Sequence, residues 1–200
     1  MKFRGAEAIV ETIEWNGQTV VSKRRNKRGY RHPALEKRLV VERLRSESRI
    51  MERLLSQGVP VPAIFSVNTS DNSIFMEFIE GQTLERALRG KDFKEHLIRT
   101  AQLLSMIHSL NVVHGDPTTS NFLVNDKIHA IDFGLSSISD DDEDRASDLR
   151  VFLESLDSHH SEINGRDTFL EAYSKGAASQ SVLEALKVLE LRGRYNLMRG

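Results

Sequence analysis

The longest regular pattern in this chain is helical, and strand patterns lie on both sides of it. Pro33 marks a helix start for residues 34–57, and Gly58 is a natural stop. Alternating apolar residues predict a strand hairpin over residues 6–23. After the helix, VPVPAIFSV and IFMEFIEG predict two more strands, the second of which Gly81 breaks. We therefore expect a sheet with one helix in the first part of the chain.

The rest of the chain predicts helices around a short hairpin. Apolar residues recur at helical spacing from Phe93 to Leu110, and they predict a buried face made of Leu97, Ile98, Ala101, Leu104 and Ile107. FLV and KIHAI flank Asn125-Asp126, which fits a tight hairpin, and three helical patterns follow the acidic run DDDED. We expect an α+β fold with a β-rich N-lobe over residues 1–80 and a short α-helical C-lobe over residues 81–200.

Composition limits the classes of protein that this chain can be. Its 200 residues leave room for one catalytic unit, and a formal net charge of −1 gives no global attraction to nucleic acid or membrane. The absence of cysteine excludes disulfides and thiolate metal sites. MKFRGAEAIVE has no apolar leader, and no stretch is long enough to span a bilayer. We expect a cytoplasmic protein without a membrane partner.

The strongest local signal is HGDPTTSN at residues 114–121, followed by Asp-Phe-Gly at residues 132–134. Phosphoryl transfer needs divalent metal on the nucleotide phosphates and a carboxylate that faces the acceptor hydroxyl. Asp116 suits the base, and Asn121 and Asp132 suit ligands of Mg²⁺. His114 has the alternative interpretation of a packed histidine. Because order and spacing agree, we predict an ATP-dependent phosphotransferase with a minimal two-lobed protein-kinase-like fold, made by the two lobes together.

A second signal comes from the helix over residues 34–57. Its apolar stripe runs through Val40, Leu44, Met51 and Leu54/Leu55, and Glu47 falls on that stripe. A carboxylate buried alone would cost several kcal/mol, so it needs a cation across the core. Lys23, at the end of the strand VVSK, is the best candidate, and the pair would position ATP. The alternative is a Glu47 that tilts to solvent.

Other residues complete the expected nucleotide site. IFMEFIEG resembles a kinase hinge, in which Met76 is the gatekeeper and backbone groups of Glu77 and Ile79 bind adenine. An ordinary edge strand is the alternative. Leu123 is a further expected nucleotide-binding residue. GAEA stands where kinases have a glycine-rich loop, so we expect Gly5 to let backbone amides approach the phosphates, with Glu7 beside it either at Lys23 or metal or in a simple turn.

These motifs together resemble one family from end to end. Its marks are GAEA, SKRRNKRGYRHPALE, RSES, HGDPTTSN, IDFGL, EDRASDL and the terminal RGRYNLMRG. The chain resembles the small atypical kinase/ATPase subunit of the KEOPS (EKC) complex, the PRPK-type family, and we expect an archaeal member. Pro117 departs from the usual leucine of the family, and the basic tail is diluted, which weakens an expectation of strong tRNA contact.

The resemblance implies ATP and Mg²⁺ as cofactors, hydrolysis of ATP, autophosphorylation on serine or threonine, and a role in the threonylcarbamoyl modification of adenosine in tRNA. It also implies three partners. The metal-dependent tRNA-modifying subunit of the complex would bind the C-lobe, and a small regulatory subunit would bind the N-lobe. tRNA itself would contact basic segments such as residues 23–38.

Three alternatives stay open from the residues alone. The first is a RIO-like or small-molecule phosphotransferase, because such enzymes share His-Gly-Asp. The second is an adaptor that binds nucleotide without catalysis, against which the intact Asp116, Asn121 and Asp132 argue. The third is a nucleic-acid-binding module, which depends on the basic stretch and the terminal RGR. Only 66 residues follow Gly134, which favours ATPase or autokinase activity over broad kinase activity.

Overall fold

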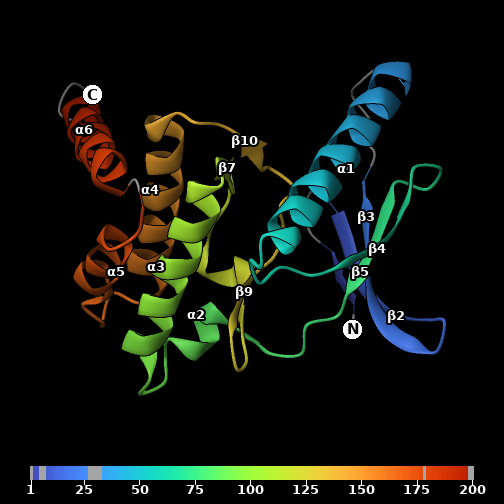
Figure 1. Ribbon diagram of the computed structural model, residues 1–200, viewed down its shortest axis with the longest axis horizontal. Helices are drawn as coiled ribbons and strands as arrows, with labels where there is room; N and C mark the ends of the chain where they lie inside the picture. Colours follow the sequence, from blue (N-terminus) through green and yellow to red (C-terminus); the bar gives the residue numbers. More distant parts are fainter. Residues whose placement is uncertain (1, 5–7, 27–32, 178, 198–200) are drawn as a thin grey trace. The chain divides into compact units, whose positions relative to one another are not determined.

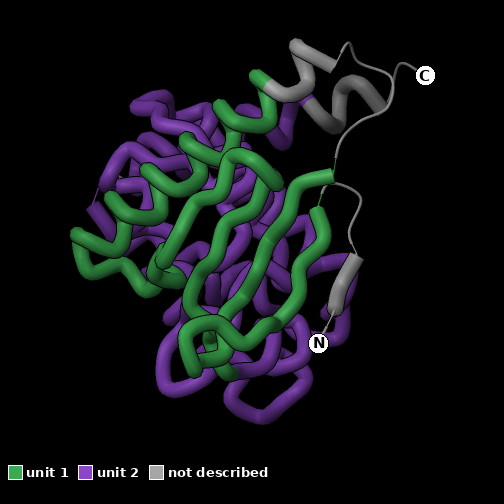
Figure 2. The backbone as a smooth tube through the Cα atoms, turned by 90° about the vertical axis from the view of Figure 1, so that its right-hand side faces the viewer, with its two compact units in different colours: residues 1–80 green, residues 81–200 purple. Residues whose placement is uncertain are grey.

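A computed structural model describes residues 2–4, 8–26, 33–177 and 179–197 of the chain. The chain divides into two compact units, Met1–Glu80 and Gly81–Gly200, which Figure 2 shows in different colours. The first unit is a sheet with one long helix, and the second is mainly helical (Figure 1). This architecture confirms the predicted α+β class. Among the helices that the structure describes, none is both long and apolar enough to cross a bilayer.

The first unit is built on a five-stranded antiparallel sheet in the order β1-β2-β3-β5-β4. Its central hairpin turns at Asn16 and Gly17, whose φ values of +50° and +79° match the two-residue turns that suit strand twist. Val20 is fully buried within this sheet. The strands are β1 (Lys2–Arg4), β2 (Ala8–Trp15), β3 (Gln18–Arg25), β4 (Ile64–Asn68) and β5 (Ser73–Glu77).

The helix α1 (Pro33–Ser56) contacts β4 and β5 of this sheet (Figure 1). It is followed by Gly58 in the left-handed region, at φ +76°, where a side chain would be strained. The helix therefore begins and ends close to the predicted residues. Its buried apolar stripe comprises Val40, Leu44, Ile50, Met51 and Leu54.

Two apolar residues that the sequence assigned to buried stripes are exposed. Leu55 is 41% exposed, because Leu54 occupies the buried position and the next residue lies 100° further round the helix. Ile98 is 38% exposed for the same reason, since Leu97 is the residue that faces the core. The prediction for these two residues was wrong, while the remaining members of both stripes are buried.

The second unit combines its helices with one two-stranded and one three-stranded sheet of short strands (Figure 1). Phe152 and Phe169 stack in its core with ring centroids 4.1 Å apart. Its helices are α2 (Leu84–Ala87), α3 (Phe93–Ser109), the 3₁₀ turn η1 (Thr119–Asn121), α4 (Asp142–His159), α5 (Gly165–Ser174) and α6 (Ser179–Leu197). Its strands are β6 (Gln82–Thr83), β7 (Val112–Val113), β8 (Phe122–Val124), β9 (Ile128–Ala130) and β10 (Ser137–Ile138).

Pairing of these strands places the two sequence motifs next to each other. β8 and β9 form the predicted hairpin, with Phe122 opposite Ala130, so the end of the first motif lies beside the start of the second. β7, just before His114, pairs with β10, which follows the Asp-Phe-Gly triplet. The loop that carries Asp116 and the loop that carries Asp132 are therefore both framed by paired strands.

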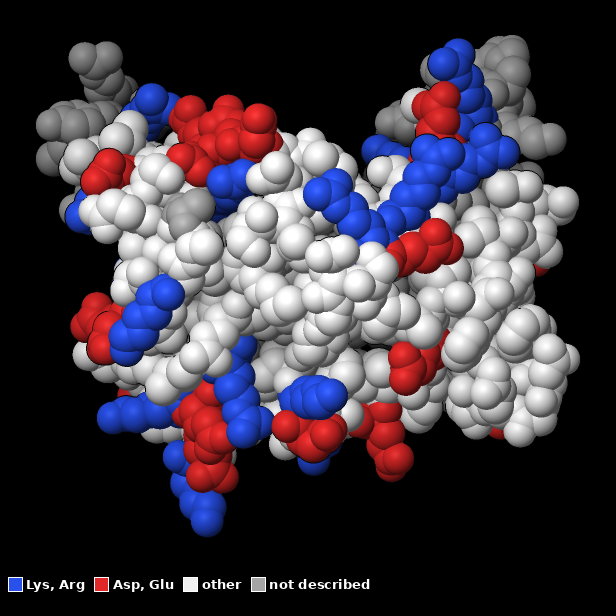
Figure 3. Space-filling view, in the orientation of Figure 1, with Lys and Arg blue, Asp and Glu red and all other residues white. Residues whose placement is uncertain are grey.

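The acidic run of residues 140–144 begins α4. The Asp141 side chain caps the helix by accepting a hydrogen bond of 2.8 Å from the amide of Glu143. Carboxylates in the first turn also interact favourably with the positive end of the helix dipole. Red side chains gather at this end of α4 in Figure 3. The acidic run is thus a helix start.

Candidate functional site

The first unit brings the predicted ion pair together. The ammonium Nζ of Lys23, on β3, lies 2.5 Å from Oε1 of Glu47, on α1. The two side chains are only 7% and 1% exposed. The alternative of a solvent-facing Glu47 is therefore wrong. A carboxylate at this depth is stable only with charged or hydrogen-bonding partners, and Lys23 is one such partner.

Sequence reasoning missed a second cation at the same carboxylate. Arg25 donates from Nη2 to Oε2 of Glu47 at 2.6 Å, and its side chain is 5% exposed. The signal was present in the sequence, because residues two apart on a strand share a face and Arg25 follows Lys23 at that spacing. Each oxygen of Glu47 thus has its own cation.

The hinge-like segment is more constrained than its sequence suggests. Met76 and Ile79 are buried, and Glu77 is half-buried at the end of β5. The amide of Glu77 donates to the Ala63 carbonyl at 2.8 Å, and the Ala63 amide donates to the Glu77 side chain at 3.1 Å. An adenine contact at Glu77 would therefore use its carbonyl oxygen. Gly5 and Glu7 lie outside the described residues.

The second unit brings Asp116 and Asn121 into direct contact. The amide nitrogen Nδ2 of Asn121 donates to the Asp116 carbonyl at 2.8 Å and to the Asp116 carboxylate at 3.0 Å. This orientation turns the amide oxygen of Asn121 away from the carboxylate, where it can serve as a ligand for a hard cation. Burial raises the pKa of the Asp116 carboxyl, and the charges of Asp132 and Asp148 add to this rise. A raised pKa makes Asp116 a better proton acceptor.

Asp132 follows β9 in an unusual backbone conformation. Its φ is +63°, in the left-handed region, and its carboxylate accepts a hydrogen bond of 3.2 Å from the Gly134 amide. The preceding residue, Ile131, donates its amide to the Asn121 carbonyl at 2.9 Å. This backbone hydrogen bond therefore holds the segment of Asp132 beside Asn121, the other predicted metal ligand. Strained residues of this kind persist only where their surroundings fix them, and they cluster at functional sites.

The donor set suits Mg²⁺ held jointly with phosphate. Within the described part of the chain, no three His, Cys, Asp or Glu side chains gather closely enough to hold a metal alone. One carboxylate and one amide oxygen are the few protein ligands that Mg²⁺ uses when phosphates and waters complete its octahedral coordination.

Leu123, which the sequence predicted as a nucleotide contact, lies half-buried in β8 opposite His129.

His114 connects the two loops from a fully buried position. Its Nε2 donates to the Ile131 carbonyl at 3.1 Å, so Nδ1 is left as an acceptor, and the Asp116 amide donates to it at 3.4 Å. Its ring also lies against Phe133, with centroids 4.7 Å apart. Burial lowers the pKa of His114, which keeps the ring neutral. His114 is both packed and hydrogen-bonded.

Sequence reasoning also missed the residues on α4 that hold the catalytic loop. The Asp148 carboxylate accepts from the backbone amides of His114 and Gly115 at 2.6 and 2.8 Å. About two turns further along α4, the Ser155 hydroxyl accepts a hydrogen bond of 3.1 Å from the Thr119 amide. Asp148 is 2% exposed and lies on the buried stripe of α4 with Phe152 and Leu156, so its position on an apolar stripe was a signal of the same kind as that of Glu47.

Gly115 is required by two separate constraints. Its φ of +83° is strained for any residue with a side chain. A Cβ at this position would also lie 2.3 Å from the Leu135 carbonyl oxygen, which is backbone and cannot turn aside. The loop before Asp116 therefore passes directly against the segment after the Asp-Phe-Gly triplet.

The family model described as the RIO domain matches residues 13–150. The chain is 40% identical over 193 residues to the EKC/KEOPS complex subunit BUD32 of Encephalitozoon cuniculi, covering 96% of this chain and 94% of that protein. It is also 40% identical to the probable bifunctional tRNA threonylcarbamoyladenosine biosynthesis protein of Methanoculleus marisnigri. That match covers 96% of this chain and 35% of the relative, so the chain spans about a third of that protein's length.

A solved structure shares the fold. The crystal structure of the Rio2 kinase-ADP/Mg²⁺-phosphoaspartate complex from Chaetomium thermophilum matches with a TM-score of 0.67. The match covers 98% of this chain and 70% of that one, at 14% sequence identity. At this identity the likeness concerns the fold alone, and it confirms the predicted protein-kinase-like architecture.

The ion cluster around Glu47 generates a prediction about stability. Glu47→Gln removes the charge that compensates two buried cations, so we expect the free energy of unfolding to fall by about 3–5 kcal/mol. Lys23→Ala should cost less, because Arg25 still neutralises the carboxylate. Denaturant unfolding of each variant measures the difference. Glu52→Gln, an exposed change on the same helix, should alter stability by no more than about 0.5 kcal/mol. Equal stabilities for Glu47→Gln and Glu52→Gln would contradict the prediction.

Proposed function

Because this chain belongs to the RIO-domain family, and within it to the family of the EKC/KEOPS complex subunit BUD32, we propose that it is an ATP-dependent serine/threonine kinase and ATPase. We propose further that it acts in a KEOPS complex that supports threonylcarbamoyladenosine modification of tRNA. The observation that carries the catalytic part is the contact of Asn121 with Asp116, on a loop tied through Ile131 to Asp132. The names of the relatives support the second part.

The described side chains have distinct roles in this proposal. Mg²⁺-ATP, when bound, supplies the phosphoryl group. Lys23 would contact its α- and β-phosphates, and Glu47 keeps the Lys23 ammonium in place. Asp132 and the amide oxygen of Asn121 would hold the metal, and Asp116 would accept the proton of the attacking hydroxyl or water. Its raised pKa suits this last role.

Adenine recognition in this proposal uses the end of β5. Met76 would lie beside the base, the Glu77 carbonyl would accept a hydrogen bond from the adenine amino group, and the Ile79 amide would donate to a ring nitrogen. The engagement of the Glu77 amide with Ala63 supports this division, because only the carbonyl of that residue is then offered to a ligand. Leu123 adds an apolar contact, and Gly5 lets backbone amides approach the phosphates.

Partners follow from the relatives. In the Methanoculleus marisnigri relative, the part similar to this chain shares one polypeptide with a longer remainder, and the name calls the whole bifunctional. This supports a partner that works directly beside the chain. We propose the metal-dependent tRNA-modifying subunit at the C-lobe and a small regulatory subunit at the N-lobe.

Contact with tRNA has support on the first unit. Five arginines lie exposed along the described part of α1, namely Arg38, Arg43, Arg45, Arg49 and Arg53, and Figure 3 shows basic side chains following this helix. Steps of four residues advance about 6 Å along a helix and stay near one face, so Arg45, Arg49 and Arg53 form a row. Such a row can follow a phosphate backbone, and its contribution would weaken with salt.

Turnover of ATP is the direct test of the catalytic proposal. Asp116→Asn and Asp132→Ala should each lower phosphate release by at least about a hundredfold. Asp132→Ala should spare nucleotide binding more than turnover, since adenine contacts remain. Phosphate release and calorimetry with Mg²⁺-ATP measure the two properties. Asp126→Ala, in the exposed turn between β8 and β9, is the matched control. Unchanged turnover in Asp132→Ala would favour the adaptor alternative.

The pH dependence of turnover gives a further prediction. Since only ionised Asp116 accepts a proton, the rate of phosphate release should fall on acidification at a pH above the ordinary aspartate range.

The role in tRNA modification needs a test in cells. Cells depleted of this chain should lose threonylcarbamoyladenosine from their tRNA, because the complex lacks an active subunit. The wild-type chain should restore the nucleoside, and Asp132→Ala should not. Mass spectrometry of hydrolysed tRNA measures its level, and affinity purification of the tagged chain identifies the partners. An unchanged level of the nucleoside in depleted cells would exclude this role.

Autophosphorylation should occur after the Asp-Phe-Gly triplet, at residues 136–139. Ser137 is exposed on β10, whereas the Ser136 hydroxyl donates to the Phe133 carbonyl and the Ser139 hydroxyl donates to Asp144. We therefore expect phosphate on Ser137 first. Phosphate on Ser139 would lose the Asp144 bond and repel the acidic start of α4, which loosens this segment.

Mass spectrometry after incubation with Mg²⁺-ATP locates the modified serine. The same reaction with Asp116→Asn is the control, and it should show no phosphate. Phosphate found only outside residues 136–139, or in equal amount in the control, would rule out the proposal.

A further inference from the structure

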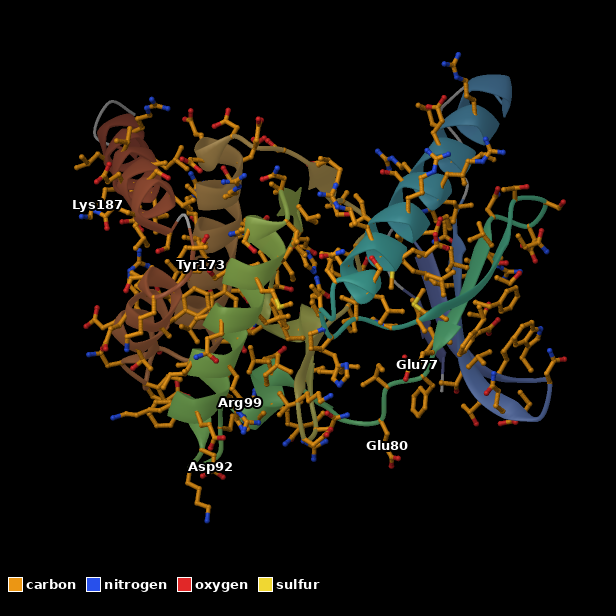
Figure 4. All side chains as sticks on the ribbon, in the orientation of Figure 1. Glu77, Glu80, Asp92, Arg99, Tyr173 and Lys187 are labelled. Carbon is orange, nitrogen blue, oxygen red and sulfur yellow. The ribbon has the colours of Figure 1, made fainter. Side chains whose placement is uncertain are left out.

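A buried chain of polar side chains runs from α5 to the catalytic loop. We propose that the Tyr173 hydroxyl is a remote positioning group, which fixes the ring of His108 and through it the carboxylate that holds the loop of Asp116. The Tyr173 hydroxyl lies 2.7 Å from Nδ1 of His108, and Nε2 of His108 lies 3.1 Å from Oδ2 of Asp148. All three residues are at most 3% exposed. Figure 4 labels Tyr173, which lies among α3, α4 and α5.

The contacts of Asp148 decide which atoms carry the protons in the hydrogen bonds that link Tyr173, His108 and Asp148. Both carboxylate oxygens of Asp148 accept from backbone amides, so each of them acts as a hydrogen-bond acceptor. Nε2 of His108 must therefore carry a proton that it donates to Asp148. In the neutral ring Nδ1 is then an acceptor, and the Tyr173 hydroxyl is its donor. Burial raises the pKa of Tyr173, so the hydroxyl keeps the proton that it donates.

Asp148 transmits this arrangement to the site. Its Oδ2 accepts from both His108 and the His114 amide, and its Oδ1 accepts from the Gly115 amide. Gly115 immediately precedes Asp116. A carboxylate that loses the alignment of His108 can rotate about its terminal bond, which changes both amide contacts. The effect on Asp116 is then geometric, because Tyr173 lies three hydrogen bonds from the catalytic loop.

The ring of Tyr173 is held independently of its hydroxyl. It stacks on Phe169, with centroids 6.5 Å apart and planes 18° apart, and its edge meets His108 at 5.7 Å. Tyr173→Phe therefore keeps the packing and removes one donor, which leaves Nδ1 of a buried imidazole unsatisfied. This makes the substitution a clean probe of the hydrogen bond.

The test combines NMR and kinetics on the full chain. In the wild type we expect ¹⁵N shifts of His108 that mark Nε2 as protonated and Nδ1 as an acceptor. In Tyr173→Phe we expect the Nδ1 resonance to move, and the amide protons of His114 and Gly115 to shift as their bonds to Asp148 lengthen. A second expectation rests on the proposed ATPase function: in Tyr173→Phe, turnover should fall about tenfold while the KM for ATP stays within about twofold of the wild-type value. Ser174→Ala is the matched control, because that hydroxyl donates only to the nearby Glu171 carbonyl.

Separate outcomes overturn the separate parts of this proposal. A wild-type His108 protonated on Nδ1, or on both nitrogens, overturns the assignment without any variant. Unmoved His114 and Gly115 amides in Tyr173→Phe overturn the link to the loop, and so does a turnover loss equal to that of Ser174→Ala. A lower melting temperature with unchanged amide shifts and unchanged kcat would mean a purely structural role, which also overturns it. The NMR readouts do not depend on ATP hydrolysis, so an inactive wild type would contradict the proposed function and leave this test intact.

Discussion

The carboxylate of Asp148 is the interaction on which the site of the second unit depends. It sits 2% exposed on α4 and accepts hydrogen bonds from the amides of His114 and Gly115, directly before Asp116. A charge at this depth is tolerated only if its acceptor sites are filled, so the helix and the loop stabilise each other. The loop cannot drift without leaving a buried charge unsatisfied. Because the buried carboxylate needs both amide donors, it fixes the backbone conformation of the loop before Asp116.

A buried carboxylate also organises the first unit, where its partners are side-chain cations instead of backbone amides. Glu47 is buried between the ammonium of Lys23 and the guanidinium of Arg25, which reach it from one face of β3. Pairs of this kind seldom add much stability compared with apolar residues, but breaking one is costly. Their use here is to hold a strand lysine at one place relative to the helix. Both units therefore place their chemically active groups by means of one buried acid each.

The comparisons agree with this interpretation at two levels. Identity of 40% over nearly the whole chain places it in the family of the BUD32 subunit, and the RIO-domain match spans both the Glu47 cluster and the Asp148 loop. The Rio2 structure shares the architecture at only 14% identity. A fold can thus persist when most side chains differ, because strand order, helix stripes and a few buried polar anchors are enough to specify it.

Local sequence determined much of this protein. Spacing identified the long helix, the β8–β9 hairpin, the contact pair Lys23–Glu47 and the motif that carries Asp116 and Asn121, because each depends on periodicity or on a short motif. Tertiary structure decided the rest. The hydrogen bond from His114 to Asp148 joins residues 34 apart, and that from Tyr173 to His108 joins residues 65 apart. No local pattern encodes such partners, since they meet only after α3, α4 and α5 have packed. A buried charge on an apolar stripe can be read from sequence, but which group satisfies it is set by the topology that brings the two elements together.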